Sequence, residues 1–413
     1  MTYLTSAAHA RWLESETDRL LGFSRASRHP AGGFAWLGTA GEPDLARPVE
    51  LWVTCRMTHV FALGQLLDRP GCGELVDHGV SALTGRFHDP ANGGWFTSVG
   101  ADGPTVRDKA AYQHAFVVLA AASATCAGRP GARALLDEAL DVLLGHFWDD
   151  EHAMVVEQWD EAFERRDSYR GVNANMHAVE ALLTAADVTG DRDLLQRAEE
   201  ITARVVHELA RASGWRLPEH HTRDWEPIWD YNIDAPAHPF RPYGATIGHL
   251  LEWSRLVLHL RAALGESEAP GWMLTDAQLL FQRGIVDGWA VDGADGFVYT
   301  VDWDGRPVVR ERMHWVAAEA SAAAAALHQV TGDAVYADWY DLVWEHIVGS
   351  FIDEGGGSWH HELDAHLRPS DSVWQGKPDT YHALQATLLP RLPLAPMLAA
   401  ALAARLLERQ PEP

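Results

Sequence analysis

The sequence predicts an all-α protein in which six inner and six outer helices form an (α/α)6 barrel, or toroid, with short β-hairpins in the loops at one mouth. A polar stretch rich in Gly and Trp, then an almost wholly apolar helix, then an amphipathic helix recur six times along the 413 residues. A helix that is apolar all round must be covered on every side, whereas an amphipathic helix needs cover on one side only. The alternation therefore predicts an inner ring inside an outer ring.

The six polar stretches are expected to form the hairpins, because several have Gly, Asp or Pro where a tight turn needs them. They span residues 32–43, 93–104, 152–161, 214–225, 295–307 and 355–369. Each is followed by a segment that begins with polar or aromatic residues and then becomes apolar. These inner helices are expected within residues 50–64, 109–123, 171–186, 242–256, 312–327 and 378–389.

The outer helices have ordinary amphipathic spacing. In residues 190–209, apolar side chains recur at intervals of three and four, and Asp191 can cap the first turn. Helical regions at the start of the chain, around residues 10–15, and at its end, residues 394–410, are expected to meet and close the ring. Because no linker rich in Pro or Ser divides the chain, we expect residues 1–413 to form a single domain.

The composition excludes several classes of function. The 58 acidic and 33 basic side chains give a formal charge of −25, which repels phosphate backbones and anionic lipid head groups. Neither a nucleic acid nor a membrane is therefore expected as a partner. The three cysteines form no C-x-x-C pair, and the sequence begins without a basic segment followed by an apolar one. These features are typical of a cytoplasmic protein.

Histidines recur near the start of the expected inner helices. The N-termini of all inner helices point to the same mouth, so side chains of their first turns are expected to converge there. A single histidine on an apolar face is usually a hydrogen-bonded core residue, but six in register indicate a shared role. Successive members are 55 to 72 residues apart, close to one repeat; they are His59, His114, His177, His249, His314 and His382.

The other side chains expected at the mouth are typical of a sugar site. Arg56, Asn173 and the carboxyl groups of Glu252 and Glu319 can bind hydroxyl groups, and histidines can transfer protons near neutral pH. Glu252 follows His249 by three residues and so shares its helix face, where it can hold the imidazole tautomer; a purely structural pair has the same spacing. Aromatic faces for the C–H groups of a sugar ring are expected from Tyr112, Trp315 and Trp374.

No metal or cofactor is expected. Residues 219–221, "EHH", and 359–366, "WHHELDAH", are rich in ligand types, but neither places two imidazoles on one helix face. We interpret both as loop segments that line or cover the mouth. Phosphate-binding loops, a dinucleotide-binding glycine pattern and a nucleophile elbow are absent from the sequence.

Four segments, in order, resemble the N-acylglucosamine 2-epimerase superfamily. They are "LWVTCRMTHVFALG", "NANMHAVEALL", "GHLLEWSRL" and "PDTYHALQA". The chain is most similar to the aldose–ketose isomerase branch, the mannose and sulfoquinovose isomerases, mainly through "TCRMTH". The resemblance implies an (α/α)6 barrel and a metal-free reaction by two catalytic histidines, which match His249 and His382. It also implies that sugar hydroxyls contact the residues matching Arg56, Asn173, His177 and Glu252.

We therefore expect an isomerase that interconverts D-mannose and D-fructose, and also D-lyxose and D-xylulose. The reaction opens the pyranose ring, removes the C2 proton and returns a proton to C1 through a cis-enediol, so two groups that titrate near neutrality suffice. We assign the C2-to-C1 proton transfer to His382 and ring opening to His249, although the sequence is equally compatible with these two roles being exchanged. The expected partner is a monosaccharide, and the expected state is a monomer or homodimer.

Other functions stay open at this point. A sugar 2-epimerase of the N-acylglucosamine or cellobiose type belongs to the same superfamily, and a sulfoquinovose isomerase would use further cations such as Arg170 and Arg241. From a different class, an (α/α)6 glycoside hydrolase would need two carboxyl groups flanking the scissile bond. A protein-binding role is known for a family member first described as a renin-binding protein, but it would not require the polar mouth.

Overall fold

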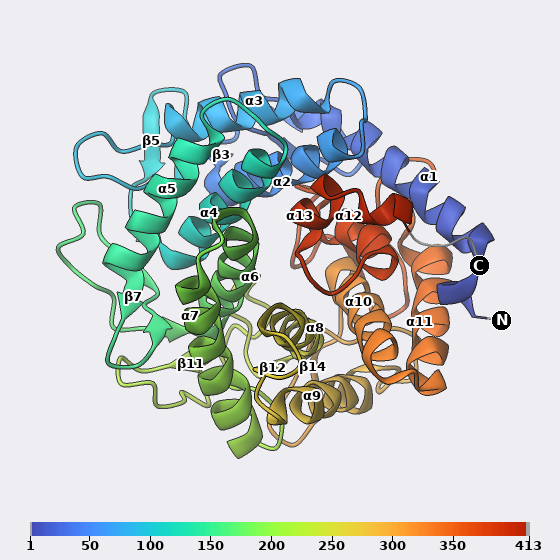
Figure 1. Ribbon diagram of the computed structural model, residues 1–413. Helices are drawn as coiled ribbons and strands as arrows, with labels where there is room; N and C mark the ends of the chain where they lie inside the picture. Colours follow the sequence, from blue (N-terminus) through green and yellow to red (C-terminus); the bar gives the residue numbers. More distant parts are fainter. Residues whose placement is uncertain (1, 410–413) are drawn as a thin grey trace.

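Six inner helices surround a common axis, and six outer helices surround them (Figure 1). The computed structural model describes residues 2–409. The inner helices are α2 (Leu51–Leu66), α4 (Ala111–Cys126), α6 (Val172–Thr189), α8 (Ile247–Leu264), α10 (His314–Thr331) and α12 (Tyr381–Leu388). The outer helices are α1 (Ala7–Ser24), α3 (Cys72–Thr84), α5 (Ala132–Val142), α7 (Arg192–Thr202), α9 (Trp272–Gly288) and α11 (Ala334–His346). The predicted (α/α)6 barrel is confirmed.

Several short helical segments extend or connect these helices. The π-helices η3 (Leu143–Phe147), η4 (Ala203–Ala210) and η5 (Ile347–Phe351) continue α5, α7 and α11. The 3-10 segments are η1 (Tyr3–Thr5), η2 (Arg25–Ser27), η6 (Leu389–Arg391) and η7 (Leu406–Arg409), and the last α-helix is α13 (Leu398–Ala403). No helix between residues 2 and 409 has both the length and the hydropathy that crossing a bilayer requires.

Burial explains why the two kinds of helix separate. Every residue of α2 from Leu51 to Gly64 is buried, as the apolar sequence requires. In α7, burial is limited to one face, whose members are Leu194, Ala198, Ile201 and Thr202. Asp191 caps α7 as expected, with its side chain accepting a hydrogen bond from the backbone N–H of Asp193.

Very short strands tie the repeats together at one mouth. Five inner helices are preceded directly by a two-residue strand: β3 (Val49–Glu50), β6 (Lys109–Ala110), β10 (Arg170–Gly171), β12 (Ala245–Thr246) and β15 (Arg312–Met313). Each pairs antiparallel with a strand that follows the next outer helix: β4 (Ser98–Gly100), β9 (Gln158–Trp159), β11 (His220–His221), β13 (Thr300–Val301) and β16 (Glu362–Leu363). At the sixth junction, the backbone N–H of Lys377 donates to the carbonyl of Leu37.

The remaining strands complete these hairpins. They are β1 (Trp36–Leu37), β2 (Pro43–Asp44), β5 (Gly103–Val106), β7 (Trp148–Asp149), β8 (Met154–Val155) and β14 (Pro307–Val309). β1 pairs with β2, β4 with β5, β7 with β8, and β13 with β14, all antiparallel. The hairpins therefore gather at the mouth to which the inner helices point their N-termini, as predicted.

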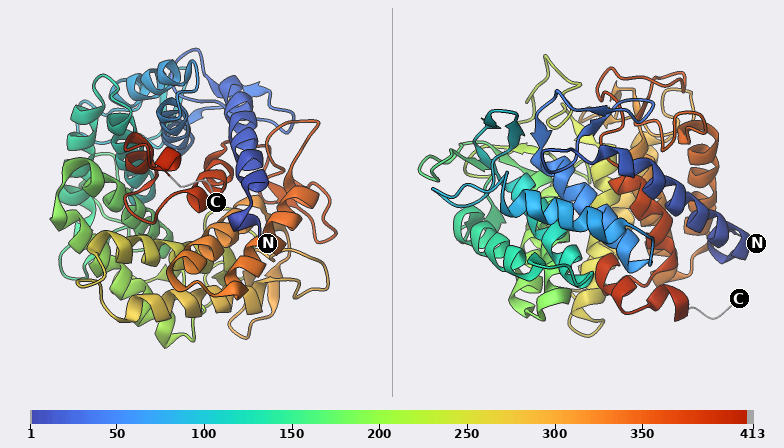
Figure 2. Two further views of the ribbon diagram at one scale, coloured as in Figure 1. Left: turned by 45° about the vertical axis from the view of Figure 1, so that its right-hand side comes forward. Right: turned by 90° about the horizontal axis from the view of Figure 1, so that it is seen from above.

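The ring closes differently from the sequence-based expectation. The helical regions at the two chain ends were expected to meet, but α1 packs on α12 as its outer partner, and α12 contacts both α10 and α2. The last helix, α13, packs against α2, α4 and α6 at the end of the ring opposite the hairpins (Figure 2). The two end regions do come close, because Glu14 of α1 lines one cavity with Leu402, Arg405 and Leu407, but the ring closes through α1 and α12. Residues 1 and 410–413 of the predicted domain, and so the end of the predicted last helix, lie outside the described residues.

Outer and inner helices approach closely where glycine faces the inner helix. A Cβ atom on Gly79 of α3 would lie 2.0 Å from Oγ1 of Thr58, which is buried on α2 and donates to the carbonyl of Thr54. We expect Gly79→Ala to lower the free energy of unfolding by about 1–3 kcal/mol, because the helices must separate. Urea unfolding followed by circular dichroism measures this change.

A matched control exists on another outer helix. Gly22 of α1 is exposed, and a Cβ atom added to it would meet nothing within 4 Å. Gly22→Ala should therefore be neutral or stabilise the protein by up to about 1 kcal/mol through helix propensity. Equal effects of the two substitutions would contradict the close packing inferred at Gly79.

Candidate active site

A cavity lies at the mouth where the first turns of the inner helices converge. Each inner helix or the loop that enters it supplies part of the wall, together with residues of the hairpin loops. The lining residues are Trp52, Arg56, Tyr112, Asn173, His177, Pro239, Phe240, His249, Glu252, Tyr299, His314, Trp315, His361, Trp374, Pro378, Asp379 and His382. Nearly all of the side chains predicted for the site are therefore brought together. Glu319 lies behind His382 rather than on the wall, and His59 and His114 do not line the cavity either.

Two histidines on the wall are held by carboxyl groups in the same way. Nδ1 of His249 lies 2.8 Å from Oε1 of Glu219, and Nδ1 of His382 lies 2.9 Å from Oε1 of Glu319. A carboxylate only accepts hydrogen bonds, so each Nδ1 is the donor and Nε2 is left for proton exchange with a bound molecule. The partner of His249 is thus Glu219, from the loop before β11, and not Glu252 as the spacing suggested.

Trp315 lies against both of these imidazoles. Its ring centroid is 5.4 Å from that of His249 and 5.6 Å from that of His382. The indole fits because α8 has a glycine beside it: a Cβ atom on Gly248 would lie 2.2 Å from the Trp315 ring. The two imidazoles and an aromatic face therefore form one continuous part of the wall.

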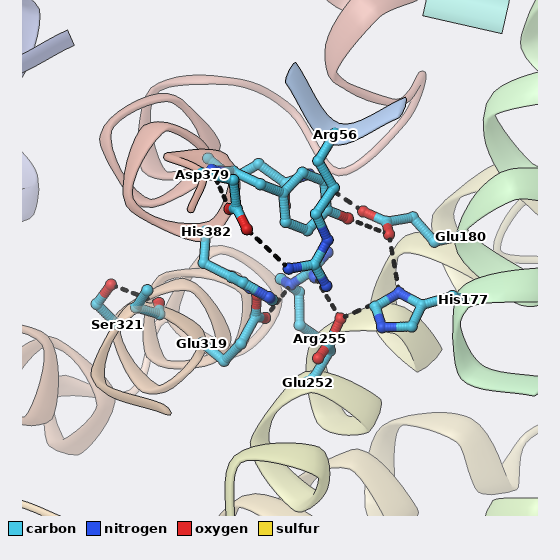
Figure 3. Close-up of polar contacts among 12 residues, drawn as sticks. Arg56, His177, Glu180, Glu252, Arg255, Glu319, Ser321, Asp379 and His382 are labelled. Carbon is cyan, nitrogen blue, oxygen red and sulfur yellow. Dashed lines mark hydrogen bonds and ion pairs between the residues drawn. The ribbon is translucent and has the colours of Figure 1, made fainter. Parts of the chain in front are cut away.

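Arg56 of α2 is a buried cation on the cavity wall (Figure 3). It donates to the hydroxyl of Tyr112 at 3.0 Å and to Oδ2 of Asp379 at 3.4 Å. Burial acts to lower the pKa of Arg56, but Tyr112, Asp379, Tyr381 and Glu252 outweigh it and raise the pKa above its usual range. Arg56 is accordingly a permanent positive charge at the cavity.

Two carboxyl groups, Glu252 and Glu319, contact the guanidinium of Arg255, and a third, Glu180, lies close by (Figure 3). Nε of Arg255 donates to Oε2 of Glu319 at 2.7 Å, and its Nη2 lies 3.6 Å from Oε1 of Glu252. Glu180 lies next to His177, with 3.5 Å between Oε2 and Nδ1. Burial alone would raise the pKa of Glu319, but Arg255 and His382 lower it to about 2. Burial, with Glu319 alongside, raises the pKa of Glu252 well above its usual range.

Burial keeps most of these imidazoles neutral. It lowers the pKa of His177 to about 4 and that of His314 to about 3. The pKa of His382 is also lowered by burial, while the hydrogen bond to Glu319 acts in the opposite direction. Desolvation is the main cause of this low basicity.

Two of the six recurring histidines do not reach the cavity. Nδ1 of His59 lies 2.7 Å from the hydroxyl of Ser123 on the neighbouring helix α4. His114 is bonded to the carbonyl of Ala110 and to the backbone N–H of Trp95. The expectation of six converging histidines was therefore wrong for these two. The length of the repeat correctly places one histidine in each inner helix. It does not show how far along the helix each histidine lies or which way its side chain faces.

Several wall residues were not predicted, and most of them come from loops. The sequence offered one signal for Asp379, which stands three residues before His382 in "PDTYH". In the structure, its Oδ1 accepts a hydrogen bond from the backbone N–H of Tyr381. Phe240, Tyr299 and Trp52 carried no periodic signal that separates them from packing residues. Of the loop histidines interpreted as lining the mouth, His361 does so, stacked on His314 at 3.9 Å between centroids.

Three groups of side chains between residues 2 and 409 have donor atoms close enough together to be considered as metal sites. Two of these groups combine residues of the cavity wall with residues behind it. One group is His177, Glu180 and Glu252, and the other is Glu252, Glu319 and His382. Arg255 lies among these carboxyl groups, so a divalent cation would face a fixed positive charge at short range. The third group, Asp149, Glu151 and His152, is on the surface, and such groups are common without an ion. We therefore do not assign metal ligands.

Comparison with known proteins gives consistent matches along nearly the whole chain. A model of the family described as N-acylglucosamine 2-epimerase matches residues 32–386. A D-mannose isomerase from Thermobifida fusca is 54% identical over 407 residues, which cover 98% of this chain and 99% of that protein. A D-mannose isomerase from Pseudomonas cannabina pv. alisalensis is 50% identical over 406 residues, 97% of each chain. A crystal structure of D-mannose isomerase matches with a TM-score of 0.86 and 29% identity, over 92% of this chain and 97% of that one.

The buried His59 predicts a specific pH dependence of stability. Burial lowers its pKa to about 4, while an unfolded histidine titrates near 6.5. Between these values the unfolded chain takes up a proton that the native protein does not, so this group makes stability fall as the pH falls. In His59→Gln, the slope of unfolding free energy against pH over this window should be smaller by about one proton. Urea titrations of both proteins at several pH values measure it, and identical slopes would contradict the assignment.

Proposed function

This chain belongs to the N-acylglucosamine 2-epimerase family, and from that premise we propose that it is an aldose–ketose isomerase that interconverts D-mannose and D-fructose. The observation that carries the proposal is the pair of carboxylate-held imidazoles, His249 and His382, on the wall of one cavity. Such a pair can both take and return a proton without a redox cofactor. The same chemistry extends to D-lyxose and D-xylulose, which differ from the first pair by the terminal CH2OH group.

The two imidazoles divide the proton transfers. His249 assists ring opening by exchanging protons with the ring oxygen and the anomeric hydroxyl. His382 removes the proton from C2, and the oxygen on C1, which gains negative charge, takes the proton of the neighbouring C2 hydroxyl in the cis-enediol intermediate. His382 then returns its proton to C1 while the oxygen on C2 becomes the carbonyl of the ketose. Arg56 stabilises the negative charge that develops on these oxygens.

Unpartnered polar atoms support the binding of a sugar here. Buried polar atoms normally have hydrogen-bond partners, so those without one are suited to a ligand. On the cavity wall they include Oδ1 of Asn173, Nδ1 of His177, Oε1 of Glu252, Nε2 of His314 and Nε1 of Trp374. Together with Arg56 and Tyr112, these groups would bind the hydroxyls, and the faces of Trp315 and Trp374 would contact the sugar C–H groups. Glu319 acts through His382.

The charge at the cavity favours a neutral sugar over a sulfonated one. Within residues 2–409, Arg56 is the guanidinium on the wall, and it already faces Asp379. Arg170 donates to the carbonyls of Asp167 and Tyr169, and Arg241 lies near Glu157. Neither of these two lines the cavity, so the sulfoquinovose alternative loses the cations it would use.

The remaining alternatives are less well supported. A 2-epimerase would use the same enediol but return a proton to the opposite face of C2 instead of to C1, so only the products distinguish it. A hydrolase would use two wall carboxyl groups, but Asp379 is engaged by Arg56 and the backbone of Tyr381. The near full-length relatives favour the isomerase. We propose that the protein acts in the cytoplasm on a free monosaccharide, as a monomer or homodimer, with its three cysteines as free thiols.

A substrate panel tests the proposed reaction. The sugars are mannose, lyxose, fructose, glucose, N-acetylmannosamine, cellobiose and sulfoquinovose, each assayed for isomerisation and epimerisation with and without EDTA. We expect mannose and fructose to interconvert, and EDTA to leave the rate unchanged. Epimerisation of an N-acetyl sugar or cellobiose as the main activity would refute the proposal. Loss of activity in EDTA that one added divalent ion restores would refute the metal-free mechanism.

Asparagine variants separate the two histidines. His382→Asn should abolish both isomerisation and exchange of the C2 proton with solvent deuterium, because no enediol forms. His249→Asn should slow turnover of mannose by roughly 10²- to 10⁴-fold, as expected for loss of a general acid or base. An aldotetrose cannot form a six-membered ring, so it should be spared by the His249 change and not by the His382 change. Equal losses on both sugars would refute the division, and the reverse pattern would exchange the roles.

A further inference from the structure

The carboxyl groups of Glu252 and Glu319 have opposite surroundings although they share one guanidinium (Figure 3). Both oxygens of Glu319 are hydrogen bonded, Oε1 by His382 at 2.9 Å and Oε2 by Arg255 at 2.7 Å. Oε1 of Glu252 is buried without a hydrogen-bond partner; Nη2 of Arg255 is 3.6 Å away and Nδ1 of His177 is 4.0 Å away. The same guanidinium therefore bonds one carboxyl group and leaves the other without a bond.

Burial and two neighbouring carboxyl groups disfavour the ionised form of Glu252 and outweigh the opposite effect of Arg255 and Arg56. Its side chain is only 1% exposed, and a buried carboxylate without hydrogen bonds is strongly destabilising. Two further carboxyl groups, Glu180 and Glu319, lie nearby, and Arg255 is bonded to Glu319. The titratable and charged groups that face Glu252 come from every inner helix: Arg56 on α2, Tyr112 on α4, His177 and Glu180 on α6, Arg255 on α8, Glu319 on α10, and Tyr381 and His382 on α12.

Glu180 has hydrogen-bond donors other than Arg255. Its Oε1 accepts from Gln385 at 3.2 Å, and its Oε2 accepts from the hydroxyl of Tyr381. Glu180 is therefore stabilised as a carboxylate by neutral donors of α12. Of these three carboxyl groups, Glu252 is the one on the cavity wall, and it is the one that lacks such donors.

We propose that Arg255 assigns opposite charge states to two carboxyl groups: Glu319 is the carboxylate that orients His382, and Glu252 is a neutral acid whose O–H donates a hydrogen bond to a sugar oxygen. The identity of the ligand rests on the proposed isomerase function, whereas the division of charge does not. Arg255 does not line the cavity and is a positioning residue. Glu252 touches the substrate.

The division has a clear use in the reaction. When His382 takes the C2 proton, negative charge develops on the carbonyl oxygen of the open sugar. A neutral O–H donor stabilises that oxygen, whereas an ionised Glu252 would repel it. No proton needs to leave Glu252 for this stabilisation. A carboxylate at Glu319, one layer behind, meanwhile stabilises the imidazolium that His382 becomes.

Infrared difference spectroscopy tests the charge states without substrate. Above neutral pH, exposed carboxyl groups are ionised, and a protonated carboxyl group is recognised by its own carbonyl stretch. We expect this band in the wild-type protein and its loss in Glu252→Gln. In Glu319→Gln the band should persist only to a lower pH than in the wild type, because the neighbouring carboxylate is removed and Arg255 is freed. A wild-type spectrum that loses no such band in Glu252→Gln would overturn the proposal.

Activity measurements test the donor. Glu252→Gln keeps a neutral hydrogen-bond donor of the same shape and should lower kcat/KM by up to about tenfold, whereas Glu252→Leu lacks the donor and should lower it about 10²- to 10³-fold. Glu319→Gln, which removes the carboxylate behind His382, should cost far more than Glu252→Gln. Equal losses in the Gln and Leu variants of Glu252 would show that a donor is not needed there.

The pH profile tests Arg255. Without the guanidinium, Glu319 protonates more readily, so the acidic limb of kcat/KM in Arg255→Met should move to higher pH, while Arg255→Lys should keep the limb near its wild-type position. An unchanged limb in a folded Arg255→Met protein would overturn the positioning role.

If the substrate panel refutes the isomerase, the infrared result still decides the charge states of the two carboxyl groups. If the isomerase stands and the infrared band is absent, only this inference fails.

Discussion

The whole arrangement depends on the constraint that an inner helix is covered on every side. Along α2, residues Leu51 to Gly64 are all buried, so few polar side chains can be accommodated beyond the first turns. Polar groups are instead concentrated at the N-terminal end, where the hairpin loops meet the ring. The two-residue strands that precede five inner helices fix where each first turn begins. One packing requirement thus decides both the fold and the place where chemistry can occur.

The buried charges are stabilised by partners from other helices and loops, so the site forms only when the ring of helices is assembled. Arg56 on α2 faces Asp379 at the start of α12, and Arg255 on α8 bonds Glu319 on α10. His249 on α8 depends on Glu219 from a loop 30 residues earlier. Because a buried ion without its partner is strongly destabilising, these pairs hold the helices in register as well as the side chains in place.

The sequence was sufficient for the architecture and for much of the wall, but not for contacts between elements. Alternating apolar and amphipathic helices predict the barrel, and the polar starts of the inner helices predict Arg56, His249 and His382 on the wall. Spacing within one helix also suggested that Glu252 holds His249. The real partner, Glu219, belongs to a loop, and the position of Glu319 behind His382 depends on how α10 is rotated against α12. Contacts of this kind leave no periodic trace in a single sequence.

The pairing of α1 with α12 links the first helix of the chain to the last of the ring. Thr17 and Ser24 of α1 share hydrogen bonds with Thr387 and Thr380 at 2.7 Å, and the apolar face of α1 is covered from that side. During synthesis on the ribosome, α1 must therefore remain without its native cover until the segment that bears His382 has emerged. A chain that terminates early has neither a closed ring nor the second imidazole. Loss of α12 thus removes ring closure and His382 together.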